Sequence, residues 1–343
     1  MKNTKQLISY RFSKNYFINK RKSNKLSINL FDFDLGSHKT CPACNSKDAY
    51  LISNIDRLGF PCDTVVCKNC DFVFNDSFIK DSISFYKNSW GQLHWGDEKK
   101  NFEKRTNIDH YSWRRFSYIS NILDGALATK NKILEIGCGD GCNLYPYHLN
   151  GYKVTGLDYD KRYLLPGKNK GMNLLVGDIF NNNIDEEFDL ILIIHAFEHM
   201  QDLDKVICEV KKYLSSDGLI YVEVPGIINL NQINSKRLNS GGMRSFNNFL
   251  GYIQFQHNFH FDAHHLKYFW ERNGFETLSC DEWIRAIFKP IPNENINYDK
   301  INEDFIKYDF DIINHLKNVE KNFLSLSNIM RAGLSYINKK LFN

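Results

Sequence analysis

Short apolar runs alternate with helix-length segments through the middle of the 343-residue chain. The pattern predicts strands and intervening helices in turn: strands near 132–137, 153–158, 173–177, 188–195 and 219–224, and helices near 141–150, 160–170 and 202–215. The strands are rich in Ile, Leu and Val without polar alternation, which is typical of a sheet covered on both faces. We therefore predict a parallel α/β sheet in this part of the chain.

The end of the chain has a different period. Residues 300–343 carry apolar side chains at roughly helical spacing, at Ile312, Leu316, Val319, Phe323 and Met330. This predicts a helical extension over residues 293–343, serving either as a packing helix or as a homodimer contact.

Charge is unevenly distributed along the sequence. The formal net charge is +4, and 43% of the residues are hydrophobic, which is enough for a buried core and excludes a disordered chain. Eight Lys and Arg residues lie between residues 2 and 25, before the first acid, Asp32, so the body that follows has a net negative charge. We expect residues 1–36 to be a basic tail that is either solvated and disordered or directed at phosphate, nucleic acid or an anionic membrane.

The sequence shows no membrane-spanning segment. The longest apolar run, Leu190–Ile194, is far shorter than the ~20 residues of a membrane helix. The first 30 residues lack the apolar core, roughly 7–15 residues long, of a secretory signal. We expect a cytoplasmic protein.

Four of the nine cysteines form two C-x₂-C pairs, with 22 residues between the pairs. Two such pairs can place four thiolates around one tetrahedral ion, and a reducing cytosol disfavours disulfides. We expect structural Zn²⁺ in a zinc-ribbon module over residues 37–75, bound by Cys41, Cys44, Cys67 and Cys70. All four positions on the ion are then filled by protein, which leaves none for chemistry; the alternative is a set of unrelated buried thiols.

A glycine-rich turn, Gly137 to Gly141, follows the first predicted strand. Asp158 ends the second strand, 21 residues after Gly137, where an acid can accept hydrogen bonds from ribose hydroxyls. Asp178 follows the third strand, and the fourth leads into His195. Ligands of parallel sheets bind beyond the carboxyl ends of the strands, which is where all these residues lie.

Residues 132–290 resemble a class I S-adenosylmethionine-dependent methyltransferase. The matching segments are ILEIGCGDG, GLDYD, VGD, FDLILIIHAFEHM and LDKVICEVKKYLSSDGLIYVEVPG, followed by a later segment from Gln256-His257 to Asn273-Gly274-Phe275-Glu276. The resemblance implies a doubly wound, seven-stranded, mostly parallel Rossmann-like sheet in a methyltransferase domain over residues 132–292. Its last strand would be antiparallel, in a final hairpin of Phe275–Cys280 and Arg285–Phe288.

The resemblance also implies S-adenosylmethionine as cofactor and a set of residues that bind it: Glu135, Gly137, Cys138, Gly139, Asp158, Tyr159, Asp178 and Ile179. A nicotinamide dehydrogenase shares the glycine-rich turn and the acid on the second strand. Its fingerprint needs a third Gly or Ala three residues after the second glycine, where this chain has Cys142. The methyltransferase is therefore the favoured interpretation.

Methyl transfer from a sulfonium is an in-line displacement, so the enzyme aligns the acceptor and, for a hydroxyl or carbon acid, removes a proton. His199 is the first candidate base, with Glu198 beside it, and His195 and His257 come next. Two alternatives stay open: the Glu-His pair only fixes the loop, or His195, Glu198 and His199 hold Mg²⁺, a hard ion that imidazoles suit poorly. The histidines at 260, 264 and 265 are expected at a helix entry or on the surface.

The segment joining the two modules, residues 76–131, is too aromatic for a flexible linker and is expected to pack over the active site. Its aromatic residues include Phe85, Tyr86, Trp90, Trp95, Tyr111, Trp113 and Tyr118. Trp and Tyr can stack on sugar faces, and Arg114 and Arg115 could pair with a diphosphate.

This order of modules is similar to that of bacterial sugar methyltransferases with an N-terminal zinc-binding domain, and of methyltransferases in surface-polysaccharide pathways. The resemblance implies a small-molecule or glycan acceptor, a nucleotide sugar or surface-glycan precursor, methylated on O or C. Two alternatives are an RNA base methyltransferase whose basic tail tracks phosphate, and a scaffold that binds cofactor without catalysis.

Overall fold

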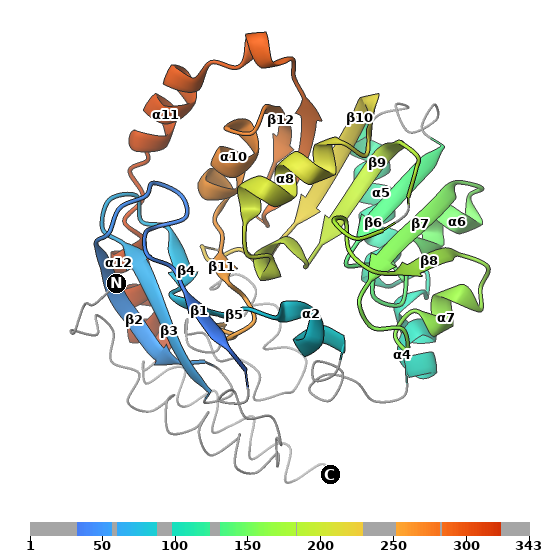
Figure 1. Cartoon of the computed structure of the whole chain (residues 1–343), viewed down its shortest axis with the longest axis horizontal. Helices are drawn as coiled ribbons and strands as arrows, with labels where there is room; N and C mark the ends of the chain where they lie inside the picture. The colour runs from blue at the N-terminus through green and yellow to red at the C-terminus, as the bar shows by residue number, and fades with distance from the viewer. Residues whose placement is uncertain are drawn as a thin grey trace. The chain divides into compact units, whose positions relative to one another are not determined.

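The computed structural model covers the full chain and describes residues 33–56, 60–87, 98–123, 131–182, 184–228, 252–281 and 283–323. The chain divides into two compact units (Figure 1). The first comprises Met1–Lys80, Pro225–Leu266 and Asn302–Asn343, and the second Asp81–Val224 and Lys267–Ile301. The units are interleaved along the sequence, whereas the sequence analysis expected successive domains. Residues 225–266, expected in the methyltransferase domain, group with the cysteine module. The expected basic tail lies outside the described residues up to residue 32.

The second unit contains a seven-stranded sheet in the order β12-β13-β10-β9-β6-β7-β8. Its strands are β6 (Lys132–Ile136), β7 (Lys153–Asp158), β8 (Asn173–Val176), β9 (Phe188–Ile194), β10 (Leu214–Glu223), β12 (Phe275–Cys280) and β13 (Arg285–Pro290). Strands β6 to β10 pair in parallel, and β13 is antiparallel to both of its neighbours. The predicted mostly parallel sheet with a late antiparallel strand is therefore confirmed.

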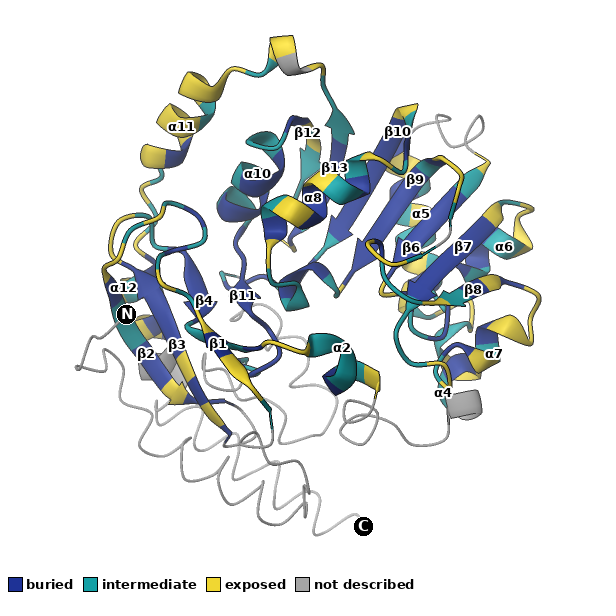
Figure 2. Ribbon diagram, viewed as in Figure 1, coloured by how far each residue is buried: buried dark blue, intermediate teal, exposed yellow. Residues whose placement is uncertain are grey.

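Helices cover both faces of this sheet. On one face, Leu190 and Leu192 of β9 share a core cluster with Ile119 of α5 (Tyr111–Leu123) and Tyr147 of α6 (Tyr145–Leu149). The alternate residue Ile191 is equally buried and points to the other face, on which α8 (Leu203–Lys211) lies (Figure 1). Figure 2 shows the central strands β6 and β9 buried along most of their length, whereas the outer strands β8 and β12 are partly exposed. Residues buried on both faces explain the continuous apolar runs in the sequence.

The helices after β6 and β7 are shorter than predicted. Residues 141–150 and 160–170 were expected to be helical, but α6 has five residues and α7 (Leu165–Lys168) has four. Each has a proline in its first turn, Pro146 and Pro166. Because proline has no N–H to donate to an earlier turn, regular helix begins only at the proline.

The remaining described helices of the second unit are short or lie at its edges. They are α2 (Ser82–Phe85), α4 (Glu98–Arg105), the 3₁₀ turns η4 (Phe197–His199) and η7 (Asn293–Asn295), α10 (Ala263–Glu271) and α11 (Tyr298–Ile306). The last two run across the boundary between the units. Trp270 of α10 stacks on Phe288 of β13 with ring centroids 5.0 Å apart, which packs the helix against the edge of the sheet.

The first unit is built on a small sheet in the order β11-β4-β3-β2, all antiparallel. Its strands are β2 (Ala49–Ile55), β3 (Pro61–Cys67), β4 (Val73–Asn75) and β11 (Phe259–His260), and beside them β1 (Leu35–Ser37) pairs with β5 (Ser77–Ile79). Phe72, Phe74 and Phe259 stack as buried rings in its core. Pairing of β11 with β4 explains why the 225–266 segment belongs to this unit.

The C-terminal helix α12 (Ile312–Phe323) has the predicted period. Ile312, Leu316 and Val319 are all buried, so this helix packs on the first unit. Met330 lies outside the described residues. Within the described part of the chain, no helix combines the length and the apolar character needed to cross a bilayer.

Candidate active site

The order of strands in the large sheet reverses between β6 and β9: β7 and β8 follow on one side, and β10 on the other. Such a switch point opens a crevice beyond the carboxyl ends of the strands, which is where open α/β sheets bind ligands. The glycine-rich turn leaves β6 at this point, and His195 leaves β9. The predicted cofactor and catalytic residues of this unit therefore gather along one edge of the sheet.

Two glycines shape the turn after β6. Gly137 and Gly139 have φ values of +72° and +56°, a region that other residues rarely adopt. A Cβ on Gly139 would lie 2.7 Å from Tyr163 Cε1, and one on Gly137 would lie 2.7 Å from Ala196 Cβ. Only glycine therefore fits either position, and the bare backbone is open to close approach by a ligand.

Asp158, at the end of β7, is tied to this turn. Its Oδ2 accepts a hydrogen bond from Gly139 N at 2.9 Å, and its Oδ1 accepts one from Asp160 N at 3.1 Å. Burial raises the pKa of Asp158, although these backbone hydrogen bonds act against the rise. A carboxylate offers about four acceptor positions, so these backbone contacts leave Asp158 room to accept from a ribose hydroxyl.

The next strand end is organised by Asp178. Its Oδ1 accepts hydrogen bonds from Phe180 N and Asn181 N, both at 2.8 Å, so the side chain caps the loop after β8. Tyr159 Oη donates to Asp178 Oδ2 at 3.0 Å. The neighbouring Ile179 is buried. The structure thus brings the predicted ribose and adenine residues to one corner, with Asp178 already engaged in the loop.

Glu135 ends β6 in full burial. Its Oε1 accepts a hydrogen bond from Asn143 Nδ2 at 2.7 Å, while its Oε2 is buried without a partner among the described residues. Burial raises the pKa of Glu135 to about 8, although Asn143 and the charge of Arg115 act to lower it. A buried acceptor without a partner is costly, and here it fits an ammonium group such as that of a methionine moiety.

One residue that holds the turn was missed from the sequence. Arg105, at the end of α4, forms an ion pair with Asp140 inside the turn and donates to Tyr163 Oη at 3.1 Å. Asp140 is 2% exposed, so this pair is shielded from water. Arg105 lies 35 residues before its partner, and no local pattern in the sequence marks it.

A second missed contact secures the other half of the edge. Arg115 of α5 donates to both carboxylate oxygens of Glu223, at the end of β10, each at 2.7 Å. His195 Nε2 lies 3.3 Å from the same carboxylate. Burial alone would raise the pKa of Glu223, but the hydrogen bonds and charges of Arg115 and His195 bring it well below its usual range. Arg115 is therefore engaged inside the protein, which corrects the expectation that it could pair with a diphosphate.

His199 is positioned by the 3₁₀ turn η4. Its Nδ1 lies 2.9 Å from Tyr86 Oη, at the end of α2. The Tyr86 ring is stacked with that of Tyr159, with centroids 6.4 Å apart. Tyr86 therefore connects the first candidate base to the corner that holds Asp158; the sequence analysis named it only as one of several aromatic residues.

Glu198 is the least satisfied group on this edge. It is 1% exposed, and neither carboxylate oxygen has a hydrogen-bond partner among the described residues. The nearest ring nitrogens, of His195 and His199, are both 3.8 Å from its Oε1, too far for a hydrogen bond. Burial raises the pKa of Glu198 to about 7, although the charge of His195 acts against the rise. This carboxyl group therefore titrates near neutrality.

Residues 110–280 match the family model described as a methyltransferase domain. The second unit has the sheet and the glycine turn that this family implies. Residues 110–280 form a class I S-adenosylmethionine-dependent methyltransferase domain. Its methyl donor is S-adenosylmethionine, and Glu135, with its unpartnered Oε2, Asp158 and the glycine turn have the chemistry to hold that donor.

Curated relatives of the methyltransferase domain act on several acceptors. (S)-coclaurine N-methyltransferase of Thalictrum flavum subsp. glaucum is 27% identical over 44% of this chain and 40% of its own length. Ubiquinone biosynthesis O-methyltransferase of Pasteurella multocida is 25% identical over 37% of this chain and 57% of its own length. The chain thus spans about two fifths of the length of the first relative and somewhat more than half of the second. A solved S-adenosylmethionine-dependent methyltransferase from Clostridium acetobutylicum is 15% identical over 55% of this chain and 95% of its own, with a TM-score of 0.41.

Four further histidines predicted from the sequence belong to the unit that carries the cysteines. His257 is buried there. His264 and His265 lie in the first turn of α10, as expected for a helix entry, and His265 is 1% exposed. His260 lies in β11 and is 2% exposed, so the expectation of a helix entry or a surface position is wrong for it. The ring of His264 stacks on that of Tyr308, with the ring centroids 3.9 Å apart. Their burial follows from β11 and the start of α10 joining the small sheet.

The four predicted zinc-binding cysteines are brought together. Cys41 Sγ lies 3.7 Å from Cys70 Sγ, Cys44 Sγ lies 3.5 Å from Cys67 Sγ, and all four sulfurs are within 4.8 Å of one another. Tetrahedral zinc with bonds of ~2.3 Å needs sulfurs about 3.8 Å apart, so the spacing suits the ion.

Each cysteine knuckle ends in the same turn. The residues after the second cysteine of each pair, Asn45 and Asp71, both have φ of +59°, a conformation that Asn and Asp tolerate best among residues with a side chain. His265 fixes one knuckle from outside: its Nε2 lies 2.7 Å from Cys70 O and its Nδ1 2.8 Å from Asp262 Oδ1. Burial would lower the pKa of His265, but the charge and hydrogen bond of Asp262 raise it, so both ring nitrogens donate.

Proposed function

We propose that this protein methylates a sugar-type acceptor, on a hydroxyl or a carbon acid, with His199 as the base. The observation that carries the proposal is the 2.9 Å contact between His199 Nδ1 and Tyr86 Oη. Tyr86 also stacks on Tyr159, the neighbour of the ribose-binding candidate Asp158. A histidine in this place takes up a proton near neutral pH as the acceptor oxygen or carbon attacks.

In this proposal, residues of the chain bind the methyl donor, orient the acceptor and take up the acceptor's proton. Bound S-adenosylmethionine supplies an electrophilic methyl group on a sulfonium. Glu135 Oε2 would accept a hydrogen bond from the donor's ammonium, and Asp158 would accept hydrogen bonds from its ribose hydroxyls. The glycine turn lets the backbone come close to the donor, so that an acceptor beside His199 is aligned for in-line attack.

Glu198 stabilises the proton once His199 has taken it up. The Nε2 atom of His199 lies 3.8 Å from Glu198 Oε1, and the carboxyl group is shielded from water. An ionised Glu198 favours the imidazolium form at this distance, because Coulomb attraction is strong where water is excluded. His195 is the weaker candidate base, because its Nε2 lies against the ion pair of Arg115 and Glu223.

The proposal of a sugar acceptor rests on the order of the modules and on the aromatic segment before β6. The names of the curated relatives show N- and O-methyltransferases acting on small molecules, which supports a small-molecule acceptor here. A cytoplasmic location, proposed from the sequence, suits an enzyme that draws on soluble nucleotide sugars or lipid-carrier precursors.

Incubation with methyl-labelled S-adenosylmethionine and separated fractions of nucleotide sugars, polysaccharide, RNA and protein tests the acceptor class. We expect label in the nucleotide-sugar or polysaccharide fraction. Label in RNA would favour the base-methyltransferase alternative. Tight binding of S-adenosylhomocysteine with no labelled fraction would favour the non-catalytic scaffold.

We propose that the four cysteines bind one structural zinc ion. The sulfur spacing and the matched knuckle turns support this, and four protein ligands leave no coordination position for chemistry. Replacing Cys67 with Ser should lower the zinc content from one ion per chain to none in a metal assay. The exposed Cys208 offers a matched control, Cys208→Ser. Zinc retained at one per chain in Cys67→Ser would contradict the site.

A further inference from the structure

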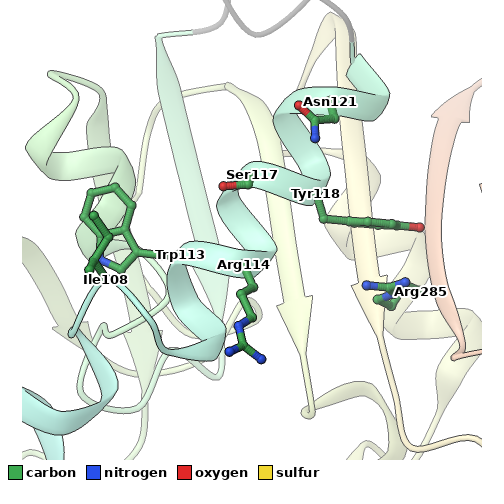
Figure 3. A pocket seen from close by; sticks show the side chains of 7 residues that line it. All are labelled: Ile108, Trp113, Arg114, Ser117, Tyr118, Asn121 and Arg285. Atoms are coloured by element: carbon green, nitrogen blue, oxygen red, sulfur yellow. The ribbon is translucent and has the colours of Figure 1, made fainter.

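A pocket of the methyltransferase unit lies on the outer face of α5, beside β13 (Figure 3). Its volume of about 530 Å³ is in the range of small-molecule sites. Two guanidinium groups, a hydroxyl, an amide and two aromatic rings line it: Arg114, Arg285, Ser117, Asn121, Trp113 and Tyr118. Its walls therefore carry donors and flat apolar surfaces, and no carboxylate.

Three of these donors are uncommitted. Arg114, Ser117 and Asn121 lie on successive turns of one helix face and are exposed. Among the residues that the structure describes, none of these side chains has a hydrogen bond or an ion pair. The adjacent Arg115 differs, because both of its contacts to Glu223 hold it inside the protein. Arg114 is thus an exposed guanidinium donor that lines the pocket.

The opposite wall is rigid. Arg285 lies over the Tyr118 ring, with its guanidinium carbon 3.8 Å from the ring centroid, and its Nε donates to Asp281 Oδ2 at 2.7 Å. Tyr118 Oη donates to the same carboxylate at 3.1 Å. The Trp113 ring is also fixed, because its Nε1 donates to Thr106 O at 3.0 Å. Asp281 offsets the charge of Arg285, so Arg114 supplies the net positive charge.

The pocket borders the part of the sheet edge that carries Glu198, His199 and Glu223, called here the acceptor half. Arg285, at the start of β13, is paired in register with Glu223, at the end of β10. Glu223 in turn binds Arg115 and lies 3.3 Å from His195 Nε2. A molecule bound in the pocket therefore contacts Arg285, which is the strand neighbour of Glu223, and Arg114, which adjoins Arg115 on α5.

We propose that this pocket binds the phosphoryl group of a small molecule. The Arg114 guanidinium matches the planar pairs of phosphate oxygens, and the hydroxyl of Ser117 and the amide of Asn121 add neutral donors. The Trp113 face receives an apolar part of the ligand. The phosphoryl group belongs either to the acceptor itself, in which case the inference rests on the proposed function, or to a free phosphate compound that regulates the enzyme.

Calorimetric titration of inorganic pyrophosphate into the full-length protein tests the site. We expect saturable binding that Arg114→Ala weakens about tenfold, as expected for a lost charge-assisted hydrogen bond. Arg114→Lys keeps the charge and should lose less. Lys212→Ala, which removes an exposed cation from the end of α8, is the control and should leave binding unchanged. Affinity for S-adenosylhomocysteine should be equal in all variants.

Steady-state rates separate the two sources. If the acceptor carries the phosphoryl group, pyrophosphate competes with it, and Arg114→Ala raises the acceptor's KM with kcat unchanged. If a free compound binds, pyrophosphate changes kcat without competing. Either pattern supports the pocket, and pyrophosphate binding that depends on Arg114 would persist even if no sugar were methylated. Absent binding, or equal binding by wild type and Arg114→Glu, would overturn it.

Discussion

The sheet edge in the methyltransferase unit has a cofactor half, with the glycine turn, Asp158 and Asp178, and an acceptor half, with Glu198, His199 and Glu223. The two halves are stabilised in different ways. On the cofactor half, backbone amides hold the carboxylates in place by hydrogen bonds. Gly139 N donates to Asp158, and Phe180 N and Asn181 N donate to Asp178. On the acceptor half, side chains carry the contacts, and the buried carboxyl of Glu198 has no hydrogen bond among the described residues. This difference fits the proposed roles, in which the cofactor half holds the methyl donor and the acceptor half keeps groups available for proton transfer.

The largest expected effect is on the acceptor half. His199→Ala should lower kcat by about 10²–10⁴-fold, the usual contribution of a general base. The affinity for S-adenosylhomocysteine should stay within about twofold, because no contact from His199 to the cofactor half is needed. Single-turnover rates and calorimetry measure the two quantities, with His148→Ala on α6 as the control. Full activity of His199→Ala would remove the histidine from the chemistry.

On the cofactor half, Asp158→Ala should weaken S-adenosylhomocysteine binding by about 100-fold. The change removes the acceptor of ribose hydroxyls and leaves Gly139 N without its partner, and hydrogen bonds to charged groups contribute about 1.5–3 kcal/mol each. Calorimetry measures the affinity, and the exposed Asp185→Ala serves as the control. Unchanged affinity in Asp158→Ala would show that the cofactor binds elsewhere.

The unpartnered carboxyl predicts a pH-dependent stability. Because burial raises the pKa of Glu198 from 4.5 to about 7 in the folded state, the folded protein keeps a proton that the unfolded chain loses between these values. Stability therefore falls as pH rises from about 4.5 to 7. Glu198→Gln, which resembles the protonated form, should avoid this loss.

The free energy of unfolding of Glu198→Gln, measured relative to that of wild type, should rise by about 3 kcal/mol between pH 4 and pH 8. Urea denaturation across that range measures the difference, and the exposed Glu303→Gln should show none. A constant difference between Glu198→Gln and wild type would mean that the pKa of Glu198 is the same in the folded and unfolded states.

The smallest effect is expected outside the turn. Arg105→Met should weaken S-adenosylhomocysteine binding by about three- to tenfold, because the ion pair with Asp140 holds the glycine turn without touching the ligand. Arg105→Lys should recover part of the loss. The acceptor's KM should stay the same, which distinguishes this positioning role from general destabilisation.

The predictable parts of the site lie close together in the sequence. The glycine turn, Asp158 and Asp178 each directly follow a predicted strand, so their position at the carboxyl edge followed from the alternating pattern. The same holds for the cysteine pairs, since each knuckle is a local turn. Arg115 and Glu223 are 108 residues apart, and Tyr86 and His199 are 113 apart. No local pattern in one sequence marks such partners.

The sequence alone determined the parallel sheet, its order of elements and the edge where the candidate site residues gather, because hydrophobic periodicity and turn chemistry are local properties. Tertiary structure decided which of these residues are paired, which are exposed and which are buried. Of two adjacent arginines, it placed Arg115 against Glu223 and left Arg114 exposed, because successive residues on a helix point in directions about 100° apart. It also buried Glu198 away from hydrogen-bond donors, and burial depends on what the rest of the chain packs against a residue.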